Sequence, residues 1–305
     1  MSEGTGRKVI RAISTWLNRA LMVVLCLPLA MGCYALWDSH VVYERANVGQ
    51  WQPYKPTEPE PLSFWELQRI NPEVCAWLSV YGTNIDYPVC RAADGDQDKY
   101  LTADAKGEYS LSGALFVDVA NSADFDDFAT IVYGHHMEND VMFGQLTDFA
   151  DGEFFDEHRY GNLFVSDTNL GLDFFCYLDA DAYDRDIYRH AFSGPDERTE
   201  YLDLLRKRAK HVRDDARVSE SDHIVLLSTC AAGSTNARAI LVGKVCQQRF
   251  KNPFVKVPNL GTGVDAREGW LGVPVWCWAA LAALVALVIV LVWMRKTGKA
   301  THTDG

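Results

Sequence analysis

The sequence predicts a mainly β domain with an N-terminal helix and one inserted helix, flanked by two membrane-spanning helices. Short apolar stretches rich in β-branched residues recur at close spacing, and Gly- and Asp-rich turns separate them. Two long uncharged apolar runs lie near the two ends of the chain. These patterns leave two architectures open for the β domain, a closed barrel and a sandwich.

Composition limits the classes of function. The chain has 305 residues, of which 48% are hydrophobic and 23% charged, so it is expected to be ordered and globular. Its formal net charge is -12, and no basic stripe occurs outside the termini. We therefore expect no nucleic-acid partner.

The two apolar runs predict a chain that crosses a membrane twice. Residues 20–37 and 273–294 contain no charged side chain, and each run can cover a hydrocarbon core of about 30 Å. Basic residues flank the outer ends of both runs: Arg7, Lys8, Arg11, Arg19, Arg295, Lys296 and Lys299. By the positive-inside rule both termini are cytoplasmic, and the domain between the runs is extracellular.

Two alternatives exist for the first run. A cleaved signal peptide has similar composition, and residues 30–33 loosely resemble a lipid-attachment site ending at Cys33. Met31 fits that site poorly, and the apolar run continues through Trp37. We favour an uncleaved anchor.

The predicted organisation has seven parts. In chain order they are a cytoplasmic tail (1–19), a membrane helix (20–37), a Pro-rich extracellular spacer (38–61), the folded domain (62–250), a linker (251–272), a second membrane helix (273–294) and a cytoplasmic tail (295–305). Within the spacer, residues 50–62 are dense in Pro and Glu, which predicts extended, solvated chain.

The domain is expected to begin with a helix and to continue as strands. Ser63 is a candidate N-cap with Glu66 three residues later, which is the capping-box spacing. Expected strands cover residues 75–80, 85–89, 113–119, 129–135, 163–167, a stretch around 172–186, 223–230 and 238–245. A helix is expected over 195–212, with apolar residues at helical spacing: Tyr201, Leu204, Leu205 and Ala209.

The segment 226–238 carries the strongest chemical signal. A β-branched run ends at Cys230, a loop of small residues follows, and Arg238 opens a second apolar run. A thiol beside a fixed cation is favoured as the reactive thiolate. The alternative is two core strands with an incidental cysteine and an arginine at the rim, because a free cysteine is often a small buried hydrophobe.

A thiol nucleophile needs an imidazole partner, and His135 is the candidate. It follows Gly134 where an expected strand runs into a loop. His136 is adjacent, but neighbouring residues on a strand point to opposite faces, so the pair is not expected to bind one metal ion. The sequence has no CxxC or HExxH spacing, and we expect neither a metal nor a cofactor.

The expected domain has an odd number of cysteines. They are Cys75, Cys90, Cys176, Cys230 and Cys246. At least one thiol must therefore be free, which suits a catalytic cysteine without proving one. Cys75 and Cys90 are candidates for a disulfide or for small buried hydrophobes, and the sequence leaves both open.

Together these residues resemble the motifs of the sortases, the cysteine transpeptidases of Gram-positive cell surfaces. The matching motifs are YGHHM (133–137), LSTC (227–230) and Arg238. Residues 70–90, residues 112–127 and the helix near 195–212 are similar to stretches of class B sortases. The resemblance covers about 62–250, and it implies a closed sortase-type β-barrel.

The resemblance also implies roles for individual residues. Cys230 would attack the carbonyl of a Thr in a sorting motif, His135 would protonate the departing amine, and Arg238 would stabilise the charge on the oxygen. Thr229 is a candidate for orienting substrate, with simple β-propensity as its alternative. The implied partners are the membrane, secreted proteins with a C-terminal sorting signal, and an accepting amine from a peptidoglycan precursor or a pilin lysine.

Two features depart from the family pattern. Sortase motifs usually read TLxTC, but position 226 is Leu, for which we expect a packing change and no loss of activity. A C-terminal span is commoner in pilus-assembling class C enzymes, which leaves wall anchoring and pilus assembly both open. Other classes of protein also remain as alternatives: a papain-like or L,D-transpeptidase cysteine enzyme, whose local signatures are absent, and a non-catalytic sensor or adhesin.

Overall fold

The computed structural model describes residues 3–58, 60–137, 139–230 and 236–254. The chain divides into two compact units, Met1–Val41 with Pro258–Gly305, and Val42–Val257. The predicted second membrane helix, 273–294, and the linker beyond residue 254 lie outside the described residues. The second unit is longer at both ends than the predicted domain of 62–250.

Helix α1 (Glu3–Ala46) contains the first predicted membrane run. Its segment Ala12–Ala46 is long and apolar enough to cross a membrane, and it is the one helix in the described part of the chain that meets this criterion. A signal sequence near an N-terminus can meet the same criterion.

The predicted extended spacer is instead mostly folded. Helix α1 continues to Ala46, and two short 3-10 turns follow, η1 (Val48–Gln50) and η2 (Gln52–Tyr54). Trp51, between these turns, is 4% exposed and belongs to the barrel core. The prediction of extended, solvated chain fails around Trp51, because burial of a large aromatic side chain outweighs the polar composition around it.

Helix α2 (Leu62–Ile70) confirms the predicted helix but not its cap. Pro61 occupies the N-cap position, and Ser63 lies inside the first turn, where its Oγ donates a hydrogen bond to the carbonyl of Lys55 at 2.7 Å. Phe64 and Leu67 are the buried residues of the helix, so packing of this face sets where the helix begins.

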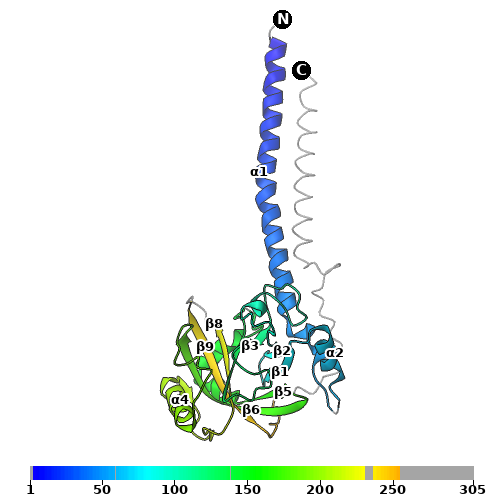
Figure 1. Ribbon diagram of the computed structural model, residues 1–305. Coiled ribbons are helices and arrows are strands. Elements are labelled where there is room, and N and C mark those ends of the chain that lie inside the picture. Colours follow the sequence, from blue (N-terminus) through cyan, green and yellow to red (C-terminus); the bar gives the residue numbers. More distant parts are fainter. Residues whose placement is uncertain (1–2, 59, 138, 231–235, 255–305) are drawn as a thin grey trace. The chain divides into compact units, whose positions relative to one another are not determined.

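Nine strands form the sheet, and eight of them close into a barrel. Their bounds are β1 (Val74–Val80), β2 (Asp86–Cys90), β3 (Leu115–Val117), β4 (Ala129–Tyr133), β5 (Tyr160–Val165), β6 (Thr168–Asp181), β7 (His211–Val212), β8 (Ile224–Cys230) and β9 (Ala237–Cys246). The order is β5-β1-β2-β3-β4-β8-β9-β6-β7, and β5 also pairs with β6. This extra pairing closes the barrel and excludes the sandwich (Figure 1).

Short helical elements fill the connections between the strands. They are η3 (Lys99–Leu101), η4 (Gly144–Ala150) and α3 (Gly152–Glu157). Helix α4 (Pro195–Arg208) lies beside the barrel near β9 (Figure 1). It ends four residues before the predicted position 212, because His211 and Val212 pair with β6 as strand β7.

Two apolar clusters lie on the two faces of the sheet. The inner cluster fills the barrel and includes Val225 and Leu227 of β8. The outer cluster lies under α4 and includes Ile224 and Leu226 of the same strand. Alternate residues of β8 therefore face the barrel interior and α4, as the period of two of a β-strand requires.

Candidate active site

Strands β4 and β8 lie side by side and run in the same direction. Their register pairs Tyr133 with Ser228, and the backbone N–H of Gly134 donates to the carbonyl of Ser228 at 3.2 Å. His135 is two residues beyond Tyr133, and Cys230 is two residues beyond Ser228. The parallel register therefore places the backbone positions of His135 and Cys230 level with each other at the same end of the barrel.

Strand β9 brings Arg238 to the same level. It runs antiparallel to β8, and its register pairs Arg238 directly with Cys230. Directly paired residues have Cα atoms about 4.5–5.5 Å apart. Three residues from distant parts of the chain thus lie at or just beyond neighbouring ends of three adjacent strands, although residues 231–235 of the connecting loop are outside the described residues.

The imidazole of His135 is held by the segment that precedes β3. Its Nε2 lies 2.9 Å from the carbonyl oxygen of Leu101. Gly113 has a φ of +61°, and a Cβ there would lie 2.4 Å from the Tyr100 carbonyl oxygen and 3.1 Å from His135 Cδ2. Only glycine fits this close approach without displacing the backbone or the ring.

The adjacent histidine has a different environment. His136 pairs with Met142 in an isolated β-bridge, and its Nδ1 is buried without a hydrogen-bond partner in the described part of the chain. His135 instead has a backbone carbonyl within hydrogen-bonding distance of its Nε2. The two rings therefore have separate environments, as expected for neighbours in extended chain.

Thr229 faces away from this cluster. It is fully buried and pairs with Ala239, which belongs to the inner cluster of the barrel. Its Oγ1 has no hydrogen-bond partner among the described residues. Thr229 is therefore part of the barrel interior, and its proposed contact with substrate stays a prediction.

Sequence reasoning missed a polar cluster beside these positions. Tyr133 donates a hydrogen bond from its hydroxyl to Asp118 at 3.1 Å, and His190 Nε2 lies 3.7 Å from the same carboxylate oxygen. The hydroxyls of Tyr188 and Ser228 are 2.9 Å apart. Asp118 directly follows β3, and the segment between β6 and α4 supplies the other two new residues, so no local sequence pattern links them.

The pKa of Tyr133 shows how these groups act on one another. Burial raises the pKa of the Tyr133 hydroxyl, and the carboxylate of Asp118 raises it further. The positive charge of Arg238 acts in the opposite direction on this pKa. The carboxylate of Asp118 and the guanidinium of Arg238 therefore have opposite effects on the pKa of this tyrosine.

The other cysteines of the barrel are poor nucleophiles. Cys75, Cys90, Cys176 and Cys246 are free thiols, so the structure decides against a disulfide between Cys75 and Cys90. Burial raises the pKa of Cys75 and of Cys176 to about 12, and it raises the pKa of Cys90 and Cys246 as well. These thiols remain protonated at neutral pH, which leaves Cys230 as the candidate nucleophile of the domain.

Leu226, the departure from the family motif, is fully buried. It lies in the outer cluster beneath α4 with Ile240 and Leu205. The position is therefore part of the packing between the helix and the barrel, and retention of activity with Leu at this position stays a prediction.

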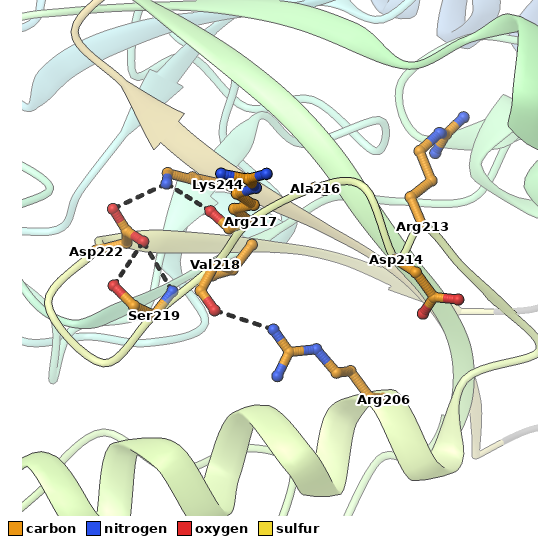
Figure 2. A pocket seen from close by; sticks show the side chains of 9 residues that line it. All are labelled: Arg206, Arg213, Asp214, Ala216, Arg217, Val218, Ser219, Asp222 and Lys244. Atoms are coloured by element: carbon orange, nitrogen blue, oxygen red, sulfur yellow. Dashed lines mark hydrogen bonds and ion pairs between the residues drawn. The ribbon is translucent and has the colours of Figure 1, made fainter.

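A surface pocket of about 520 Å³ lies at the other end of β9 (Figure 2). Lys244, on its wall, pairs with Ile224 at the start of β8, whereas Arg238 pairs with Cys230 at the end. Lys244 Nζ donates to Asp222 and to the carbonyl of Arg217, and Arg206 donates to the carbonyl of Val218. These contacts fasten the loop before β8, and none of the predicted site residues lines the pocket.

Comparisons with known proteins agree with this fold. No protein-family model matches the chain. Sortase B of Listeria monocytogenes is 30% identical over 184 residues, which is 59% of this chain and 72% of that protein. The solved sortase B from the type II pilus of Streptococcus pneumoniae is 46% identical with a TM-score of 0.52, covering 60% of this chain and 98% of that one. A Streptococcus pyogenes class B sortase involved in pilus biogenesis is 32% identical with a TM-score of 0.54, covering 60% and 97%.

Proposed function

The chain belongs to the class B sortases, and from this premise we propose that it is a membrane-anchored cysteine transpeptidase. It cleaves a sorting motif of secreted proteins after a Thr residue and transfers the acyl group to an amine at the cell surface. One observation carries the assignment of its residues. The registers of β4, β8 and β9 support neighbouring positions for His135, Cys230 and Arg238.

The reaction proceeds in two acyl transfers. The Cys230 thiolate attacks the carbonyl carbon of the Thr, and the C–N bond breaks to leave a thioester. The imidazolium of His135 gives its proton to the departing amine. An incoming amine then attacks the thioester and loses a proton to the imidazole, and Cys230 leaves as the thiolate. The products are a new amide bond and the free enzyme.

Arg238 stabilises the oxygen that becomes negative in each tetrahedral intermediate. A guanidinium is always charged and offers several N–H donors in a fixed plane. One well-placed donor in an acyl-transfer site contributes about 3–4 kcal/mol. The pairing of Arg238 with Cys230 across β8 and β9 supports this role, because it keeps the donor beside the attacked carbonyl.

The accepting amine is either a peptidoglycan cross-bridge or a pilin lysine. The similarity to sortases from streptococcal pilus systems supports the pilin lysine as the first candidate to test. The matches to sortase B proteins whose names specify no pilus keep the wall precursor as the second candidate.

We further propose that two helices anchor the enzyme with both termini in the cytoplasm. The apolar segment of α1 supports the first crossing, and the composition of residues 273–294 supports the second. Single cysteines placed at positions 5 and 300, in a protein freed of its other exposed thiols, are expected to react with an impermeant maleimide only after cell lysis. Labelling of position 300 in intact cells would contradict the two-pass topology.

The reaction is tested with the full chain in detergent and a panel of sorting peptides. Each peptide is incubated with a pilin-derived lysine peptide or with a cross-bridge amine, and the products are identified by mass. We expect a joined product for one peptide and one amine, and none with Cys230→Ala. A Cys230→Ala protein that still performs the cellular role would favour a non-catalytic binding domain.

A further inference from the structure

The last turn of α1 is fastened to the barrel by a buried tyrosine. Ala46 ends this helix and belongs to the same compact unit as the barrel. Tyr87 of β2 donates its hydroxyl hydrogen to the carbonyl of Ala46 at 3.0 Å. Both residues are at most 1% exposed, so water does not compete for this hydrogen bond.

The same hydroxyl also holds the loop that follows His135. The backbone N–H of Met142 donates to Tyr87 Oη at 3.0 Å, and Met142 is 2% exposed. The next residue, Phe143, donates its backbone N–H to the carbonyl of His135 at 3.0 Å. The Tyr87 hydroxyl thus links the carbonyl of Ala46 to the N–H of Met142. The next residue along the chain, Phe143, then bonds the carbonyl of His135.

The loop needs this support because its backbone is strained. Asn139, Asp140 and Met142 have φ values of +59°, +58° and +53°, in the left-handed region that non-glycine residues rarely adopt. Such conformations persist only where surrounding contacts hold them. Without the Tyr87 hydroxyl, the Met142 N–H would be buried and unsatisfied, so the loop would relax.

A second link joins α1 to the other side of His135. Arg45 donates from Nη1 to the carbonyl of Tyr109 at 3.0 Å. Tyr109 pairs with Ala103 in an isolated β-bridge within the segment that connects Leu101 to Gly113. Leu101 supplies the carbonyl oxygen that lies 2.9 Å from His135 Nε2, and Gly113 leaves space for the ring because it has no side chain.

We propose that Tyr87 is a positioning residue that ties the backbone around His135 to the end of α1. Residues 45–54 are then part of the catalytic unit and not a spacer. This inference rests on the proposed function, because it assigns the tyrosine a role in orienting the catalytic imidazole.

The test uses the full chain with Tyr87→Phe, which removes the hydroxyl and keeps the ring. Tyr177→Phe is the matched control: Tyr177 is also 1% exposed, and its hydroxyl donates to Asp179 at 3.3 Å, away from His135. We expect kcat to fall about ten- to a hundredfold in Tyr87→Phe because the imidazole is displaced. We expect KM within about twofold of the parent value, and kcat unchanged in the control.

A second readout does not depend on activity. In protein with 13C-labelled histidine, the NMR signal of His135 is identified by its loss in His135→Gln. We expect this signal to shift or broaden in Tyr87→Phe and to stay in place in Tyr177→Phe. An unchanged kcat together with an unchanged His135 signal would overturn the proposal, as would equal losses of kcat in the two tyrosine variants.

These readouts separate the two proposals. If the parent protein joins no peptide to an amine, the proposed function fails, while the NMR signal still tests the link from Tyr87 to His135. If Tyr87→Phe does not fold, Arg45→Ala replaces it, since Arg45 is exposed and reaches the other side of His135. A His135 signal and a kcat unaffected by Arg45→Ala would then count against the proposal.

Discussion

The two halves of strand β8 differ sharply. Its first four residues, 224–227, are apolar and buried, with alternate side chains in the barrel core and beneath α4. Its last three residues, Ser228, Thr229 and Cys230, are those that lie level with the end of β4 and with Arg238. Strand β8 thus has a packing half, residues 224–227, and a reactive half, residues 228–230, that carries the proposed chemistry.

The difference shows how the barrel supports a reactive group at its rim. The packing half sets the register of β8 against β4 and β9, because a slip of one residue would move every apolar side chain to the wrong face of the sheet. That register then fixes the positions of His135 and Arg238 relative to Cys230. Substitutions in the packing half should change the stability of the fold, and substitutions around the reactive half should change the rate of transpeptidation.

The largest expected effect separates the two histidines beside the reactive half. We expect His135→Ala to reduce transpeptidation by about 10⁴-fold or more, as removal of a member of a catalytic group does. His136→Ala should retain most activity, because His136 lies in the bridge to Met142 and its ring has different surroundings. Steady-state kinetics with the identified peptide and amine measure both variants. The opposite ranking would overturn the assignment of His135.

Substitutions of Arg238 test the electrostatic contribution of the residue that pairs with Cys230 in the reactive half. We expect Arg238→Ala to lower kcat by about 10²–10³-fold, the effect of removing one donor to the developing oxyanion. Arg238→Lys should recover only part of the loss, because an ammonium lacks the planar set of donors. Thermal unfolding of both variants serves as the control. A large fall in Tm with parent-like kcat would show that Arg238 acts in packing alone.

A substitution of Leu227 tests the role of the packing half. Its side chain is fully buried in the barrel core. We expect Leu227→Ala to lower the free energy of unfolding by about 2–5 kcal/mol through the cavity it leaves. At a temperature where the variant is folded, kcat should stay within a few fold of the parent value. Urea unfolding and kinetics measure the two quantities, and a loss of rate without a loss of stability would contradict the division of β8.

The smallest expected effect concerns the pH dependence of the thiols. Cys75 and Cys176 have pKa values raised to about 12 by burial, above the value of about 8.5 in unfolded chain. Their neutral form therefore favours the fold below about pH 8.5, and this contribution is lost as pH rises toward 12. At pH 8, iodoacetamide should label Cys230 before either of them, as peptide mass mapping would show. Early labelling of Cys176 would contradict its burial.

Much of the fold could be predicted because it depends on local pattern. The apolar stretches identified the main strands, and helical spacing identified α4. Strand β7 was missed because two residues carry no periodicity, and they pair only when β6 lies beside them. The folded segment after α1 was missed because the burial of Trp51 depends on the barrel surface and not on the Pro- and Glu-rich residues near it.

The candidate site was predicted only as far as residue chemistry allows. Cys230, His135 and Arg238 were identified by type and by their position at strand ends. Asp118, Tyr188 and His190 were not, because each lies in a connection whose neighbours come from distant elements. The full burial of Thr229 was not predicted either, because it depends on how β8 packs in the barrel.

By itself the sequence determined that this protein has a reactive thiol candidate, an imidazole partner and a guanidinium, each at the end of an apolar strand. Those features are local, and they follow from residue type and from a period of two. Only the tertiary structure decided that the three lie level at the ends of adjacent strands, and that a tyrosine of β2 connects the end of α1 to the loop that follows His135. Strand register and barrel closure are set by contacts between residues far apart in the chain, which no local pattern encodes.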